Sequence, residues 1–113
     1  MATINNVNFA DVVDEALIAA KAVVTTNWDE VQDIVENIAG GLVNDVSFIA
    51  KKQLSGEFNE EDARIYLEDQ KILARIRLRS LAIITLQIAE RIWNAIAEVF
   101  RTAIHRALNW TLL

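Results

Sequence analysis

His105 is the side chain best suited to acid–base chemistry, because it is the only histidine in the sequence. In a helix, at about 100° per residue, it shares a polar face with Asn94 and Glu98. We favour a solvated surface histidine. The alternative is a pH-sensitive pairing with Asp11, since histidine changes charge between about pH 5 and 8. The sequence offers no serine–histidine pattern for a catalytic triad, so we expect no catalytic residues.

The acidic residues raise the question of a metal site, because helical bundles can hold two metal ions with carboxylates and Glu-x-x-His motifs. That motif is absent, since Thr102 stands three residues before His105. A ferritin-like site built from Glu36, Glu90 and Glu98 across a dimer is an alternative. We favour salt bridges and solvated faces, and therefore expect no metal and no cofactor.

Arg75, Arg77 and Arg79 form the one basic cluster. They could bind a phosphate or a lipid headgroup, but we favour pairing with acidic residues of the same chain. Residues 1–62 hold twelve acidic and three basic side chains, a charge of −9, whereas residues 63–113 hold four acidic and eight basic, a charge of +4. These opposite charges favour pairing of the two halves. The total of −5 argues against nucleic acid as a partner.

The composition predicts an all-α protein with a single helical domain over residues 1–113. Hydrophobic residues make up 53% of the chain, proline is absent and glycine occurs three times, so the turns of a β-sandwich are lacking. The N-terminus resembles no secretory signal, and no apolar run reaches the length of about 20 residues that a membrane span needs. We expect a cytoplasmic protein.

Apolar residues at helical spacing predict two long arms, the first over residues 9–54 and the second over residues 60–109. Gly56 and Asn59 mark a loop at residues 55–59. The first arm could be broken near Thr25 and Asn27, where Asn27 would be an N-cap. The seven-residue spacing of apolar residues across this point favours a continuous helix, in which Asn27 would be a buried polar residue.

Two arms of similar length joined by a short loop predict an antiparallel hairpin. Facing residues should then have numbers that add up to about 115. This register sets Gly40 and Gly41 beside Ala74 and Arg75, where small residues would allow the backbones to approach. It also sets acidic residues near basic ones, in the pairs Asp11–His105, Asp14–Arg101, Glu36–Arg79 and Asp45–Lys71.

The second arm carries more apolar surface than one neighbouring helix can cover. One stripe passes through Ile92, and another lies roughly 100° round the helix. The second stripe contains Ala89 and Ala97 and the larger residues Leu86, Trp93, Phe100, Ile104 and Leu108, which are the candidate interface residues. We expect this second stripe to be the interface of a homodimer, in which two hairpins form a four-helix bundle. The predicted function is that of a non-enzymatic helical interaction or scaffold protein, acting as a homo-oligomer with a further protein partner unidentified. The alternatives are a ferritin-like metal-binding bundle and a peripheral membrane protein.

Overall fold

A computed structural model describes residues 3–24 and 26–113 and is predominantly helical, which confirms the all-α class. A small β-hairpin with two residues in each strand precedes the first helix. In it, Thr3 pairs with Asn8 and Ile4 pairs with Val7. The elements in chain order are β1 (Thr3–Ile4), β2 (Val7–Asn8), α1 (Phe9–Val23), α2 (Trp28–Leu54), α3 (Glu60–Arg79) and α4 (Leu86–Leu108).

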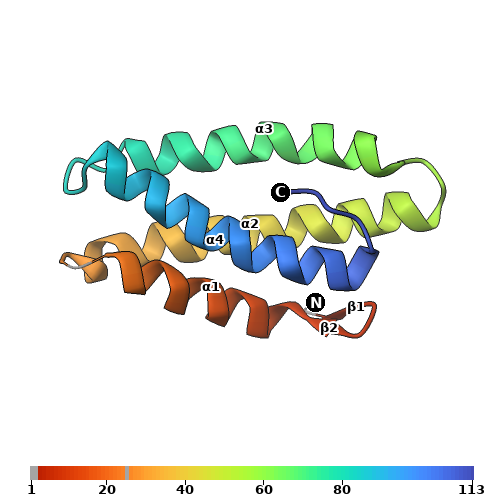
Figure 1. Cartoon of the computed structure of the whole chain (residues 1–113), viewed down its shortest axis with the longest axis horizontal. Helices are drawn as coiled ribbons and strands as arrows, with labels where there is room; N and C mark the ends of the chain where they lie inside the picture. Colours follow the sequence, from red (N-terminus) through yellow and green to blue (C-terminus); the bar gives the residue numbers. More distant parts are fainter. Residues whose placement is uncertain (1–2, 25) are drawn as a thin grey trace.

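The four helices form an up-and-down bundle in which each runs opposite to the next (Figure 1). α4 packs most extensively on α1, and it also packs on α3; the seam between α2 and α3 is looser. The interior is apolar, because no polar or charged residue in the described part of the chain is buried. Its largest fully buried side chains are Phe9, Phe100, Ile49, Leu67, Leu78, Ile92, Ile96 and Ile104.

The predicted loop at residues 55–59 lies where the sequence places it, between the end of α2 and the start of α3. Gly56 adopts a left-handed backbone conformation, with φ of 78°, which glycine enters at little cost. Asn59 and Asp62 form a capping box at the start of α3. The Asn59 side chain accepts from the Asp62 N–H (2.8 Å), and the Asp62 carboxylate accepts from the Asn59 N–H (3.1 Å).

The prediction of one helix over residues 60–109 is wrong, because the chain leaves the helix after Arg79 and begins α4 at Leu86. Ser80 turns its hydroxyl back to the Arg77 carbonyl (2.7 Å), and the Thr85 side chain accepts from the Ile88 N–H (3.1 Å) as an N-cap. Neither glycine nor proline is needed for this turn. The reversal lays α4 across α1 and α3 and buries most of both of its apolar stripes.

The first arm is also two helices, and the favoured continuous helix is wrong. Of the residues named for the break, Thr25 lies outside the described residues. Asn27 is exposed, has a left-handed backbone with φ of 63°, and makes no side-chain capping hydrogen bond. It is therefore neither a buried polar residue nor a side-chain cap. Asparagine tolerates this conformation better than most residues, which explains its place at the turn.

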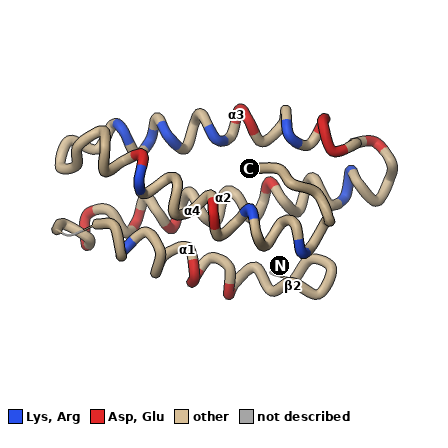
Figure 2. The backbone as a smooth tube through the Cα atoms, in the orientation of Figure 1, with Lys and Arg blue, Asp and Glu red and all other residues tan. Residues whose placement is uncertain are grey.

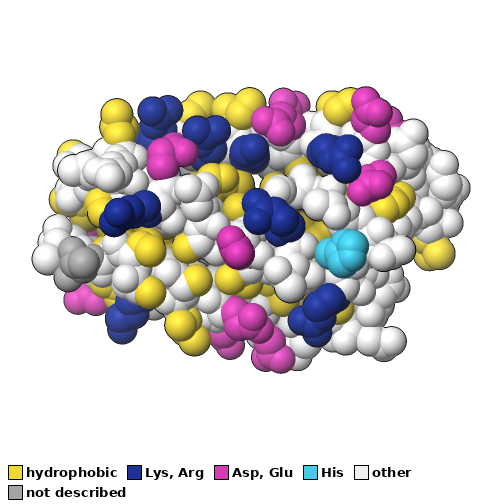
Figure 3. All heavy atoms as spheres, viewed as in Figure 1, with side chains coloured by type: hydrophobic (Ala, Val, Ile, Leu, Met, Phe, Trp, Pro, Cys, Tyr) yellow, Lys and Arg dark blue, Asp and Glu magenta, His cyan; other side chains and the backbone are white. Residues whose placement is uncertain are grey.

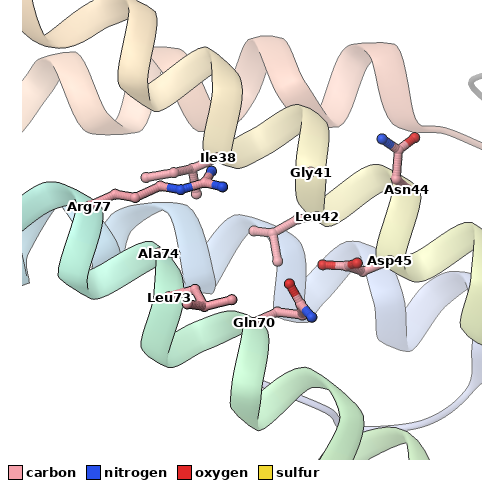
Figure 4. Close-up of a pocket in the computed structure, with 9 residues that line it drawn as sticks. All are labelled: Ile38, Gly41, Leu42, Asn44, Asp45, Gln70, Leu73, Ala74 and Arg77. Atoms are coloured by element: carbon pink, nitrogen blue, oxygen red, sulfur yellow. The ribbon is translucent and has the colours of Figure 1, made fainter.

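The seam between α2 and α3 contains a hollow lined by residues of both helices. Gly41 and Ala74, Leu42 and Leu73, and Asp45 and Gln70 line one hollow of about 180 Å³ between these helices (Figure 4). The expected close approach at the glycines is wrong, since a Cβ atom on Gly40 or Gly41 would meet nothing within 4 Å. None of the four expected charge pairs is an ion pair among the described residues.

Candidate interaction surface

The predicted interface stripe on α4 lies inside the chain's own core. Trp93, Phe100, Ile104 and Leu108 are buried, and only Leu86, which is 57% exposed, remains at the surface. α1 covers this stripe, with the rings of Phe9 and Phe100 6.3 Å apart between centroids. The prediction that one chain cannot cover both stripes is therefore wrong. It assumed two long helices, whereas the described residues form four. In this conformation the four buried residues cannot reach a second chain.

The side chains considered for chemistry remain separate at the surface. His105 is exposed, with its Nδ1 atom 3.5 Å from the Thr111 hydroxyl. Glu90 accepts from the Arg75 Nε atom at 3.2 Å and lies 3.8 Å from Arg79. In the described residues, no three histidine or carboxylate side chains converge as a metal site requires. Likewise, no described helix combines the length and the apolar character needed to cross a bilayer.

The basic cluster does not act as one unit. Arg75 and Arg79 turn toward Glu90 on α4, whereas the Arg77 Nη1 atom donates to the Asn37 side chain on α2 at 2.6 Å. Glu36, the predicted partner of Arg79, makes no ion pair with it. These arginines thus help to hold α3 to both of its neighbours, as the pairing interpretation expects, although with different partners.

Two groups with a shifted pKa lie together near the start of α3. Burial raises the pKa of Asp45, and the hydrogen bond from the Tyr66 hydroxyl, at 3.5 Å, opposes this shift only in part. Burial also raises the pKa of Tyr66, with a further contribution from the charge of Asp45. Tyr66 stacks on Phe48 with ring centroids 5.1 Å apart. Each shift is explained by burial and by the other member of the pair, so neither requires a ligand.

The outer face of α3 carries an unpartnered apolar stripe. Its inner face buries Ala63, Leu67, Ala74 and Leu78. At about 100° per residue, Ile65, Ile72 and Ile76 lie within about 40° of one another and roughly opposite that inner face. They are 62%, 45% and 56% exposed. We call these three residues the α3 stripe; Leu73, also exposed, lies beside it. Exposed apolar residues occur singly on many proteins, but an aligned row on one helix is typical of an interaction surface.

The charges of α3 divide along its length. Acidic residues concentrate in the half that follows the 55–59 loop, and basic residues concentrate toward the other end (Figure 2). Figure 3 shows hydrophobic atoms along the α3 edge of the molecule, between side chains of both charges. The residues involved are Glu60, Glu61, Asp62, Glu68 and Asp69 on the acidic side, and Lys71, Arg75, Arg77 and Arg79 on the basic side; Arg64, paired with Glu60 at 3.2 Å, is a basic residue within the acidic half.

The α3 stripe is not among the features predicted from the sequence, although a signal is present in the spacing of Ile65, Ile72 and Ile76 by seven and four residues. The helix has apolar residues on two faces, and the spacing alone does not say which face meets the core. Comparison with known proteins adds no constraint, since no family model, no curated protein and no solved structure matches the chain.

Proposed function

We propose that this protein is a non-enzymatic helical interaction protein that self-associates through the outer face of α3. The observation that carries the proposal is the α3 stripe, three isoleucines aligned on the surface and directed away from the core. Burying such a side chain contributes about 1.5–3 kcal/mol, so covering the row is favourable. Scaffolding of a further protein partner is compatible with this assembly, because the faces of α1 and α2 stay free.

The character of the interior supports an interaction role over an enzymatic one. Catalytic groups are commonly found in clefts, with pKa values shifted by burial and by specific neighbours. In the described part of the chain, every buried residue is apolar and no buried side-chain polar atom lacks a hydrogen-bond partner. The hollow between α2 and α3 has Asp45 at one end and Arg77 at the other (Figure 4), so its lining as a whole favours neither an anionic nor a cationic ligand.

An anionic membrane is the alternative partner for the α3 stripe, since basic residues lie at one end of it. An anionic bilayer would attract Arg75, Arg77 and Arg79. The same bilayer would repel Asp62 and Asp69, which flank the other end. A protein surface of mixed charge suits the full length of the helix better, so we favour a protein partner.

The test is the effect of Ile72→Glu on the mass of the protein in solution. We expect the native protein to dimerise reversibly and the variant to stay monomeric, measured by light scattering across a dilution series. In a two-fold dimer the change occurs twice, and a loss of about 3–6 kcal/mol of apolar burial weakens association at least a hundredfold. Because Ile72 faces solvent in the monomer, the variant should keep the helical circular dichroism of the native protein.

Ile18→Glu is the matched control. Ile18 is also an exposed isoleucine, 71% accessible, but it lies on α1. This variant should dimerise like the native protein. A native protein that is monomeric at every concentration, or an Ile72→Glu variant of unchanged mass, would overturn the proposal. Flotation of the native protein with vesicles of anionic phospholipid, lost in Ile72→Glu, would overturn it in favour of a membrane contact.

A further inference from the structure

We propose that the partner of the α3 stripe is the same helix of a second copy, packed antiparallel about a two-fold axis that passes between residues 70 and 71. This inference rests on the proposed function and assigns the occupant, its direction and its register. In this arrangement facing residues have numbers that add up to 141. Ile65 then faces Ile76 of the partner subunit, Asp69 faces Ile72 of the partner subunit, and Asp62 faces Arg79 of the partner subunit.

The spacing of the surface residues supports a helix pair. The row along the outer face is Asp62, Ile65, Asp69, Ile72, Ile76 and Arg79, with alternating steps of three and four residues. All six are exposed. Such steps keep a row of side chains on the seam between two helices over several turns. The row spans 18 residues, or about 25 Å of helix, and each end is occupied by a charged residue.

The charges select the antiparallel direction. A parallel pair in register would set each residue beside its own copy, so Asp62 would face a second Asp62, and Arg79 a second Arg79. Like charges at facing positions are unfavourable. Reversing one helix replaces these contacts by two equivalent aspartate–arginine pairs. The same reversal sets the acidic half of each α3 beside the basic half of the other, which suits the charge division along α3 in Figure 2.

Both charged ends are available to a second chain. The Arg79 side chain is 48% exposed, and its distance to Glu90 within the chain is 3.8 Å, longer than a hydrogen bond. Asp62 uses Oδ2 in the capping box, and no hydrogen bond within the described chain engages Oδ1. No hydrogen bond within the described chain has to be broken for the two residues to meet across the axis.

The size of this surface predicts a weak dimer. A strip about 25 Å long and about 10 Å wide, the breadth of one helix, covers roughly 250 Å² per copy. Standard stable interfaces bury about 800 Å² per partner. We therefore expect a dimer that dissociates on dilution, with a dissociation constant in the micromolar range or weaker.

The test uses disulfide trapping, for which the chain is well suited because it contains no cysteine. Two single variants, Ile65→Cys and Ile76→Cys, carry tags of different mass and are oxidised separately and as a mixture. A disulfide requires Cβ atoms about 3.5–4.5 Å apart. In the antiparallel register, residue 65 lies about 16 Å along the axis from residue 65 of the partner subunit, but directly opposite residue 76 of the partner subunit.

We expect a cross-linked species in the mixture that contains one chain of each mass, and at least tenfold less product from either variant alone. Ile18→Cys, treated in the same way, should not cross-link. Efficient cross-linking of each variant with itself would overturn the antiparallel register while leaving the proposed function intact, since the α3 stripe would still be the interface. If the native protein is a dimer but the cysteine variants yield no cross-link, the interface lies elsewhere, and both the proposed function and the antiparallel register are overturned. A native protein that is monomeric at every concentration would also overturn both.

Discussion

The contact between Phe9 and Phe100 tests whether α1 covers the second stripe of α4 within one chain. Both rings are fully buried, with centroids 6.3 Å apart and planes tilted by 37°. Phe→Leu at either position removes roughly three buried carbon atoms. At about 0.8 kcal/mol per buried CH₂, the free energy of unfolding falls by about 2 kcal/mol. A domain of this size is stable by about 5–15 kcal/mol, so both single variants should fold.

The pair should also be coupled. Aromatic rings at this separation contribute about 0.5–1.5 kcal/mol beyond the area they bury, so the double variant should lose less stability than the two single losses added together. Urea unfolding is the assay, and with a slope of about 2 kcal/mol per molar each single change shifts the midpoint by about 1 M. Phe48→Leu is the control; that ring is partly exposed, so its shift should be smaller.

Dilution distinguishes a ring contact within one chain from a ring contact across a dimer. If the rings meet within one chain, the coupling energy is the same at every protein concentration. If they meet across a dimer, the coupling weakens as the dimer dissociates. An unchanged urea midpoint in Phe100→Leu, a coupling near zero, or a coupling that disappears on dilution would each refute the assignment of Phe100 to the core of a single chain.

Two further predictions concern the partly buried carboxyl group of Asp45 and the N-cap residue Thr85. Burial raises the pKa of Asp45, so the folded state binds the proton of this carboxyl group more tightly than the unfolded state does. The free energy of unfolding therefore falls as the pH rises from 3.8, the ordinary pKa, through the raised pKa. Asp45→Asn should raise the melting temperature at pH 7 and leave it nearly unchanged at pH 3. Thr85→Ala should lower stability by about 1 kcal/mol, or about 4 °C in the melting temperature, because the N-cap of α4 is lost. In an uninterrupted helix the same alanine would instead be stabilising, so a raised melting temperature would contradict the break at residues 80–85.

The features predicted correctly depend on local chemistry. Gly56 and Asn59 end one helix and begin the next through their own backbone preference and side-chain hydrogen bonds, so the 55–59 loop is visible in the sequence. The register between α2 and α3 follows from that loop, because a short connection fixes which residues face each other. The hollow lined by Gly41, Leu42, Leu73 and Ala74 is compatible with that register, whereas none of the four charge pairs it predicts is formed among the described residues.

The break at residues 80–85 could not be predicted in the same way. Leu81, Ile83 and Ile84 continue an apolar pattern that fits a helix, and the chain has no glycine or proline there. The turn is favoured by tertiary packing, since it brings α4 onto α1. Thr85 has a capping side chain, but threonine also occurs inside helices, so its role is settled only once the chain reverses.

This reversal changes the reason to expect a dimer. With a continuous second arm, the excess apolar surface lies on α4, at Trp93 and Phe100, and a partner is needed to complete the core. With the arm folded back, α1 covers this surface of α4 in place of a second chain. The exposed apolar residues are then on the outer face of α3, because only its inner face packs in the bundle. The core is then complete in one chain, so the association proposed for Ile65, Ile72 and Ile76 is not needed for folding and is expected to be weak and reversible. A surface of this kind suits regulated assembly better than an obligate interface does, because the monomer stays folded when the partner leaves.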